Sequence, residues 1–169
     1  MTMDSLTGLI AGLDFGWLTP VAVFFDNELA LVAVTVALVL LTERRRDKVA
    51  KIGLAVVLAI LLSMAVKELV RIDRPCTLVP AKVDCPAEYS FPSGHTLFVF
   101  TVMLAFLNKP VFPIYFVYAV FVAFTRIYLG VHSFEDVAGS VALAPFAYYA
   151  SDIVWGRIRG NRYATRDKT

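Results

Sequence analysis

The sequence predicts an all-α fold, an integral membrane helical bundle with about five transmembrane helices and an N-terminal interfacial helix. Of its 169 residues, 59% are hydrophobic and only 18% are charged, and the mean hydropathy is +0.70. Soluble domains are about 45–50% apolar and about 25% charged, and a soluble domain of this length leaves much of its surface in water. The composition therefore excludes a soluble globule and a disordered chain. The length predicts a single membrane-embedded domain over residues 1–169.

The expected helices follow one another as apolar runs separated by polar breaks, and a membrane span needs about 20 mostly apolar residues. Residues 4–25 mix acidic, small and apolar residues, which is typical of a helix lying on a bilayer. The first expected span stops at Glu43 and three arginines, and the second is apolar until Lys67. The third expected span begins with proline and serine, and the fourth ends at Gly130. A basic tail follows the fifth span. The five spans cover about 27–42, 49–70, 93–108, 111–129 and 134–155.

Lysine and arginine are unevenly divided between the two sides of this bundle, and the richer side is expected to be cytoplasmic. The richer side holds Arg44, Arg45, Arg46, Lys48, Lys51, Lys109, Arg157, Arg159, Arg162, Arg166 and Lys168. The other side holds Lys67, Arg71, Arg74, Lys82 and Arg126. This bias predicts a cytoplasmic C-terminus and places the 71–94 loop and the 130–133 turn outside. A basic nucleic-acid-binding face is absent, so no nucleic acid partner is expected.

The two cysteines, Cys76 and Cys85, both lie in the outer loop. No CxxC motif or histidine-rich cluster accompanies them, so a zinc site is not expected. An oxidising compartment permits a disulfide between them. Two free thiols are the alternative.

Three polar clusters lie at the outer face, where ionisable residues mark a functional pathway or a solvent-facing anchor. The first holds Lys67, Arg71 and Arg74, which share one helical face if the helix extends that far. Three cations on one face repel one another unless an anion lies among them. The alternative is that they snorkel to lipid headgroups.

The second cluster, Phe91-Pro92-Ser93-Gly94-His95, opens the third span. A helix N-terminus that begins with glycine presents free N–H groups to a phosphate, and His95 in that position can donate a proton. The alternative is an ordinary helix cap with an incidental histidine.

The third cluster runs from Thr125 to Asp136. His132 and Asp136 are four residues apart, so the carboxylate can orient the imidazole, although Ser133 with Asp136 also resembles a capping box. Arg126 does not share this face on a continuous helix, so we expect a break at Gly130. The chain has only two histidines, and both are expected at the outer face. One shared anion-binding site therefore explains the three clusters better than a separate explanation for each.

Together these clusters resemble the motifs of the type 2 phosphatidic acid phosphatase family, which shares its core fold with vanadium-dependent haloperoxidases. The order and internal spacing of all three motifs match, and threonine in place of serine at position 125 is the one departure. The motifs cover residues 67–136, and the surrounding helices extend the resemblance over most of the chain. The matching residues are Lys67 through Arg74-Pro75, then Pro92-Ser93-Gly94-His95, then Thr125-Arg126, His132 and Asp136.

The resemblance implies catalysis through a phosphohistidine. His132 is then the nucleophile, Asp136 holds its other ring nitrogen, and His95 protonates the departing oxygen and later activates water. The implied phosphate-binding groups are Lys67, Arg74, Ser93, the Gly94 amide and Arg126. Because fixed cations take the place of a metal, the resemblance implies metal-independent activity without a cofactor.

These roles predict a membrane enzyme, a phosphatase that removes the terminal phosphate of a lipid phosphate or diphosphate in the bilayer. An outward-facing site in the plasma membrane favours a polyprenyl diphosphate such as undecaprenyl diphosphate; phosphatidic acid and phosphatidylglycerophosphate are alternatives. A non-catalytic lipid-phosphate binding or transport protein is an alternative from another class, disfavoured because binding alone needs no nucleophile. A phosphotransferase would use the same residues, and a haloperoxidase is not expected for so short and apolar a chain. The oligomeric state stays open.

Overall fold

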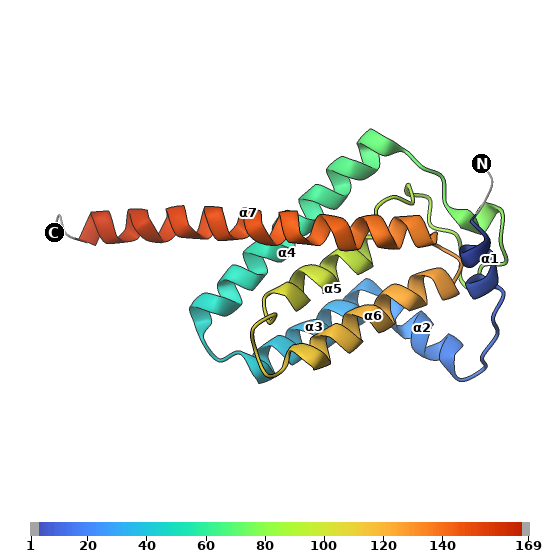
Figure 1. Cartoon of the computed structure of the whole chain (residues 1–169), viewed down its shortest axis with the longest axis horizontal. Helices are drawn as coiled ribbons and strands as arrows, with labels where there is room; N and C mark the ends of the chain where they lie inside the picture. The colour runs from blue at the N-terminus through green and yellow to red at the C-terminus, as the bar shows by residue number, and fades with distance from the viewer. Residues whose placement is uncertain (1–3, 167–169) are drawn as a thin grey trace.

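The computed structural model describes residues 4–166, with side chains described through residue 160. Within these residues the protein is all-helical, with seven α-helices, one short 3-10 helix at Pro75–Thr77 and no strand (Figure 1). The α-helices are α1 (Ser5–Ala11), α2 (Leu18–Asp26), α3 (Glu28–Thr42), α4 (Arg46–Val70), α5 (Gly94–Leu104), α6 (Phe112–Tyr128) and α7 (Phe134–Arg166). Among the predicted cytoplasmic cations, Lys168 lies outside the described residues, as do the side chains of Arg162 and Arg166.

Helix α5 is the centre of the bundle. Every residue from Thr96 to Met103 is buried, and the helix packs against α4, α6 and α7 (Figure 1). Alanines on the outer helices allow this close approach, because Ala55, Ala59, Ala144 and Ala147 are almost fully buried. The outward faces of α4 and α7 instead expose large apolar side chains such as Val57, Leu61 and Phe146. An apolar exterior around a packed apolar centre suits a lipid environment.

Among the helices of residues 4–166, α4 and α7 are long and apolar enough to cross a membrane. The pair α2 and α3 passes the same test together, but it bends by 89° at the junction, so it is a third candidate only as one broken span. Helix α6 is apolar but shorter, and α5 has 11 residues, which reach about 16 Å at 1.5 Å per residue. The predicted bundle of membrane helices is therefore present, whereas the count of about five spans is not confirmed.

The N-terminal segment differs from the single interfacial helix that the sequence predicted. Residues 4–25 form two helices, α1 and α2, separated by a turn that includes Gly12 and Gly16. Asp4 caps α1 by accepting from the Thr7 amide at 2.7 Å. The chain then turns sharply after Asp26, and the next residue, Asn27, is the N-cap of α3.

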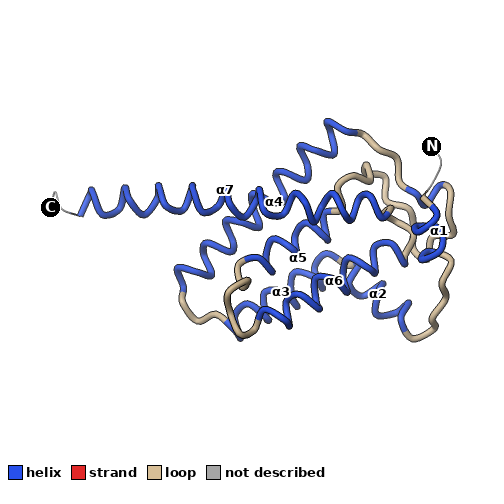
Figure 2. The backbone as a smooth tube through the Cα atoms, in the orientation of Figure 1, coloured by secondary structure: helices blue, strands red, loops and turns tan. Residues whose placement is uncertain are grey.

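The loops gather at the two ends of the bundle (Figure 2), and the loop over residues 71–93 lies at the same end as the short turn between α6 and α7. Cys76 and Cys85 are joined by a disulfide in this loop. Lys82 fixes the loop to the helix ends, because its Nζ donates to the Tyr128 carbonyl at 3.0 Å and to the Ala11 carbonyl at 2.6 Å. The helical path is interrupted at Gly130, as expected. The φ of Gly130 is +76°, and a Cβ at this position would lie 2.9 Å from the Pro80 carbonyl oxygen.

Candidate active site

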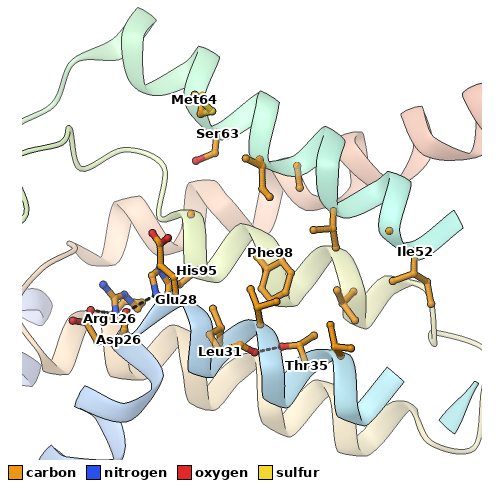
Figure 3. Close-up of a pocket in the computed structure, with 18 of the residues that line it drawn as sticks. Asp26, Glu28, Leu31, Thr35, Ile52, Ser63, Met64, His95, Phe98 and Arg126 are labelled. Carbon is orange, nitrogen blue, oxygen red and sulfur yellow. Dashed lines mark hydrogen bonds and ion pairs between the residues drawn. The ribbon is translucent and has the colours of Figure 1, made fainter. Parts of the chain in front are cut away.

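Most of the predicted site residues line one cavity of about 710 Å³, which lies between α3 and α4 over α5 (Figure 3). Its polar end is lined by Lys67, Arg74, Gly94, His95, Arg126 and His132. Two predicted residues, Ser93 and Asp136, do not line the cavity and lie behind it, at the start of α5 and α7. The rest of the lining is mostly apolar and comes from α3, α4 and α5. The cavity therefore joins a polar site to an apolar groove.

His132 lies just before α7 and is held between a carboxylate and a guanidinium. Its Nδ1 is 3.4 Å from Asp136 Oδ2, and its Nε2 is 3.1 Å from Arg74 Nη1. Because a guanidinium can only donate, Nε2 accepts, and the ring proton belongs on Nδ1, facing Asp136. This arrangement leaves the ring lone pair on Nε2, the nitrogen that lies beside Arg74, which the sequence predicts to bind phosphate.

The surroundings of His132 keep the ring neutral. The side chain is 2% exposed, and this burial lowers the pKa of His132 below its ordinary value, although the hydrogen bond to Asp136 opposes the shift. The charges of Arg126 and Arg74 lower the pKa further. A neutral imidazole at pH 7 has the free lone pair that nucleophilic attack requires.

Asp136 serves both roles that the sequence left open. Ser133 Oγ accepts from the Asp136 amide at 3.1 Å, and the Ser133 amide donates to Asp136 Oδ2 at 2.7 Å, which is a reciprocal helix cap. The same Oδ2 faces His132. The carboxylate that starts α7 therefore also fixes the imidazole.

The first cluster does not lie along one helix face. Helix α4 ends at Val70, and Arg71 takes the left-handed conformation with a φ of 52°. The chain therefore turns, and Arg74 reaches the site from the loop, where its Nε donates to the Glu88 carbonyl at 2.8 Å and its Nη1 to the Val131 carbonyl at 3.1 Å. Arg71 itself is exposed and contacts Glu68.

Arg126, near the end of α6, is the most deeply buried cation at the site. Its side chain is 2% exposed, and Nη1 pairs with Asp26 Oδ1 at 2.5 Å (Figure 3). Its Nε is the one buried side-chain nitrogen or oxygen without a hydrogen-bond partner in the part of the chain whose side chains are described. Leaving such a donor unsatisfied costs about 1–3 kcal/mol, which an incoming anion oxygen would recover.

The remaining predicted phosphate-binding groups have partners in this structure. Lys67 Nζ donates to Glu88 Oε2 at 2.9 Å and to the Tyr89 carbonyl at 3.0 Å. Ser93 is fully buried and caps α5, where its Oγ accepts from Thr96 Oγ1 at 3.0 Å. Gly94 begins α5 at the cavity wall, and the N–H groups of this helix start suit an anion.

Three further residues, which no sequence motif marks, contact the predicted site residues. Ser90 is fully buried and donates to Asp136 Oδ2, while its Oγ lies 3.4 Å from His132 Nδ1. Glu88 holds Lys67, and Asp26 holds Arg126. None of these residues belongs to one of the three motifs, and each contacts a site residue far away in the sequence, so no spacing pattern marked them.

Substituting Ser90 with alanine is expected to lower kcat/KM for phosphate release about tenfold, because Asp136 loses a charge-assisted hydrogen bond that holds it beside His132. The matched control is Ser151→Ala, since Ser151 is also fully buried but only donates to a carbonyl within α7. The measurement is phosphate release by both variants in detergent. Equal losses in the two variants would contradict a positioning role for Ser90.

Comparison with known proteins identifies the family of this chain. The family model of the PAP2 superfamily matches residues 48–160. A curated protein of Escherichia coli (strain K12) with the name "Putative undecaprenyl-diphosphatase YbjG" is 31% identical over 148 residues, 82% of this chain and 74% of that protein. A decaprenylphosphoryl-5-phosphoribose phosphatase of Mycobacterium tuberculosis (strain ATCC 25618 / H37Rv) is 35% identical over 127 residues, 75% of this chain and 71% of that protein.

Solved structures match the fold as well. The crystal structure of Aquifex aeolicus LpxE superposes with a TM-score of 0.70 at 26% identity, over 86% of this chain and 92% of that one. The transmembrane PAP2-type phosphatidylglycerolphosphate phosphatase of Bacillus subtilis gives a TM-score of 0.67 at 22% identity, over 91% of this chain and 84% of that one, and this likeness concerns the fold alone. The family model spans most of the chain and includes the three motifs that converge on the cavity. The chain therefore belongs to the PAP2 superfamily.

Proposed function

We propose that this protein is a membrane lipid phosphatase that hydrolyses the terminal phosphate of a lipid phosphate or diphosphate through a phosphohistidine on His132. The observation that carries the proposal is that one cavity has a polar end and an apolar end. Both histidines and the cations line one end, where a phosphate is expected, and an apolar groove between α3 and α4 suits a hydrocarbon chain (Figure 3). The PAP2 membership and the phosphatase relatives support the same reaction class.

The first chemical step is transfer of the phosphoryl group to the enzyme. His132 Nε2 attacks phosphorus, the N–P bond forms, and the bond from phosphorus to the lipid oxygen breaks. His95 gives its proton to that oxygen as it leaves. Lys67, Arg74 and Arg126 offset the charge on the other phosphate oxygens, together with Ser93 and the Gly94 amide. Asp136 stabilises the positive charge that develops on the attacking ring.

The second step releases phosphate. His95, now neutral, accepts a proton from a water molecule, whose oxygen attacks the phosphohistidine. The new O–P bond replaces the N–P bond, so His132 regains its lone pair and inorganic phosphate leaves. Both histidines return to their starting protonation states.

A polyprenyl diphosphate is the favoured substrate. The groove is lined by aliphatic side chains such as Val36, Ile52 and Ile60, and two of the relatives have names that refer to polyprenyl lipids. Phosphatidic acid and phosphatidylglycerophosphate are the alternatives. A binding or transport protein is the alternative from another class, but such a protein would not need a nucleophile with an oriented ring.

We also propose that the active site faces the outside of the plasma membrane, with five spans and a cytoplasmic C-terminus. The site residues lie at the end of the bundle that carries the 71–93 loop, and the basic residues Arg45, Arg46 and Lys48 lie at the other end with Arg159. The positive-inside rule places the basic end in the cytoplasm. Helices α1 and α2 would then lie at the outer interface.

A substrate panel tests this proposal. The purified protein in detergent is given a prenyl diphosphate, phosphatidic acid and phosphatidylglycerophosphate, and released phosphate is measured. We expect kcat/KM to be highest for the prenyl diphosphate, by about tenfold. A higher value for a glycerophospholipid would reassign the substrate. Absence of phosphate release from every lipid would contradict the phosphatase and favour a binding protein.

Activity is expected to survive metal chelation. The three cations Lys67, Arg74 and Arg126 supply the positive charge that a metal ion supplies in other phosphatases. Phosphate release in excess EDTA should therefore stay within about twofold of the untreated rate, since no charge is removed from the site. Loss of activity in EDTA that added magnesium restores would contradict this assignment.

A further inference from the structure

The corner between α2 and α3 brings one residue, Asp26, against two predicted members of the site. The Asp26 carbonyl oxygen lies 3.0 Å from His95 Nε2, and its carboxylate pairs with Arg126 Nη1 at 2.5 Å. Figure 3 shows Asp26 and Arg126 side by side, next to His95 at the polar end of the cavity. A single residue therefore contacts the expected general acid through its backbone and a phosphate-binding cation through its side chain.

The corner is held firmly from both sides. On one side, Asn27 Oδ1 accepts from the Ala30 amide at 3.0 Å and caps α3. On the other, the Phe25 ring packs edge-to-face against Tyr118 and Phe121 of α6, each with a centroid separation of 5.9 Å. These contacts fix the direction in which the Asp26 carbonyl points.

The contact with the carbonyl determines which nitrogen of His95 is free. A carbonyl oxygen can only accept a hydrogen bond, so His95 Nε2 carries a proton and donates it to Asp26. The proton that His95 moves during catalysis is then the one on Nδ1. Backbone and carboxylate acceptors fix imidazoles in the same way when histidine is a metal ligand or a catalytic base.

We propose that Asp26 is a positioning residue for His95. Its carbonyl oxygen holds Nε2–H, so that Nδ1 donates to the leaving oxygen and later accepts the proton of water, and its ion pair with Arg126 keeps that carbonyl in place. This inference rests on the proposed phosphatase function. His132 and His95 are thus oriented by different acceptors: a carboxylate from the start of α7 and a backbone carbonyl from the α2–α3 corner.

The first test is spectroscopic and does not depend on activity. Because the chain has two histidines, ¹⁵N-histidine labelling of the protein in micelles gives two imidazole spectra, and the His132→Ala variant assigns them. For the neutral His95 ring we expect a protonated Nε2 whose proton exchanges slowly with water, and an unprotonated Nδ1. In Asp26→Ala this exchange should become at least about tenfold faster, because the corner opens more often. A proton on Nδ1 in the wild-type protein, or unchanged exchange in Asp26→Ala, would overturn the proposal.

The second test uses the leaving group. An alkyl phosphate needs its departing oxygen protonated, whereas p-nitrophenyl phosphate releases a stable phenolate that does not. If Asp26 positions the acid, Asp26→Ala lowers kcat/KM for the lipid phosphate about 10- to 100-fold. For p-nitrophenyl phosphate, whose leaving group needs no acid, kcat/KM falls less than about threefold. Asp26→Asn, which keeps an acceptor for Arg126, should restore most of the lost rate.

The control for charge is Glu28→Gln. Glu28 lines the same cavity (Figure 3), but no hydrogen bond or ion pair joins its side chain to His95 or Arg126 among the described contacts. Its substitution should leave the ratio between the two substrates unchanged. If Asp26→Ala lowers kcat/KM equally for both substrates, the role of Asp26 is purely structural. If it raises kcat/KM equally for both, Asp26 competes with phosphate for Arg126. Either result overturns the proposal. Failure of the phosphatase function itself would instead appear as a wild-type protein that releases no phosphate.

Discussion

Replacing His132 with alanine is expected to abolish phosphate release from a lipid phosphate, with a fall in kcat of about 10⁴-fold or more, the scale seen when a catalytic nucleophile is removed. The physical reason is the loss of the group that we propose to form the covalent bond to phosphorus. Its Nε2 lone pair lies beside Arg74, its other nitrogen faces Asp136, and its burial keeps the ring neutral. The assay is phosphate release by the purified variant in detergent.

Two controls separate catalysis from folding in this experiment. Because the His132 ring is buried, His132→Gln fills more of the space than alanine and should be equally inactive while retaining the thermal stability of the wild type. His95→Ala should show the complementary defect: a phosphohistidine that forms slowly and persists, detected as alkali-stable, acid-labile label from a radioactive substrate. Retained turnover in both His132 variants would contradict the nucleophile assignment.

Local relationships in this site were predictable from sequence because they depend on few residues. His132 and Asp136 are four residues apart, and their relative position needs only the first turn of one helix. Gly130 was predicted as a break because Arg126 and His132 do not share a face of a continuous helix. The structure confirms this break, with Gly130 in the left-handed region.

Relationships between distant segments were not predictable in the same way. Ser90 and Asp136 lie 46 residues apart, and Asp26 and Arg126 lie 100 apart. No periodicity links such pairs, because their contact is produced by the packing of whole helices. The same limit applies to Arg74, which was placed on the face of Lys67 by extending α4 past Val70, where the helix ends.

Hydropathy located the helices but could not distinguish lipid contact from burial in protein. Helix α5 is as apolar as a span, yet it is short and surrounded by other helices, so its apolar residues form the core. Helix α4 exposes Val57 and Leu61 instead. An average of hydropathy along the sequence cannot make this distinction, because it contains no information about neighbouring helices.

Arg126→Lys is expected to have the second-largest effect, lowering kcat/KM about 10²- to 10³-fold. Lysine keeps the charge and can still pair with Asp26, so the ion pair alone does not predict a loss. What lysine lacks is the planar fork with several donors, including the buried Nε that has no partner in the described structure. If that nitrogen binds a phosphate oxygen, its removal weakens the transition state even when the charge is retained.

Inorganic phosphate provides the readout that separates this explanation from misfolding. As a product it occupies the same cations, so its inhibition constant should rise in Arg126→Lys, whereas the melting temperature should change little because the charge and the Asp26 partner remain. Arg44→Lys is the matched control, since Arg44 is an exposed arginine between α3 and α4, at the opposite end of α4 from the site. Unchanged phosphate inhibition in Arg126→Lys would mean that the buried guanidinium stabilises the α2–α3 corner without binding substrate. The missing hydrogen bond at Nε would then be an energetic cost that phosphate binding does not offset.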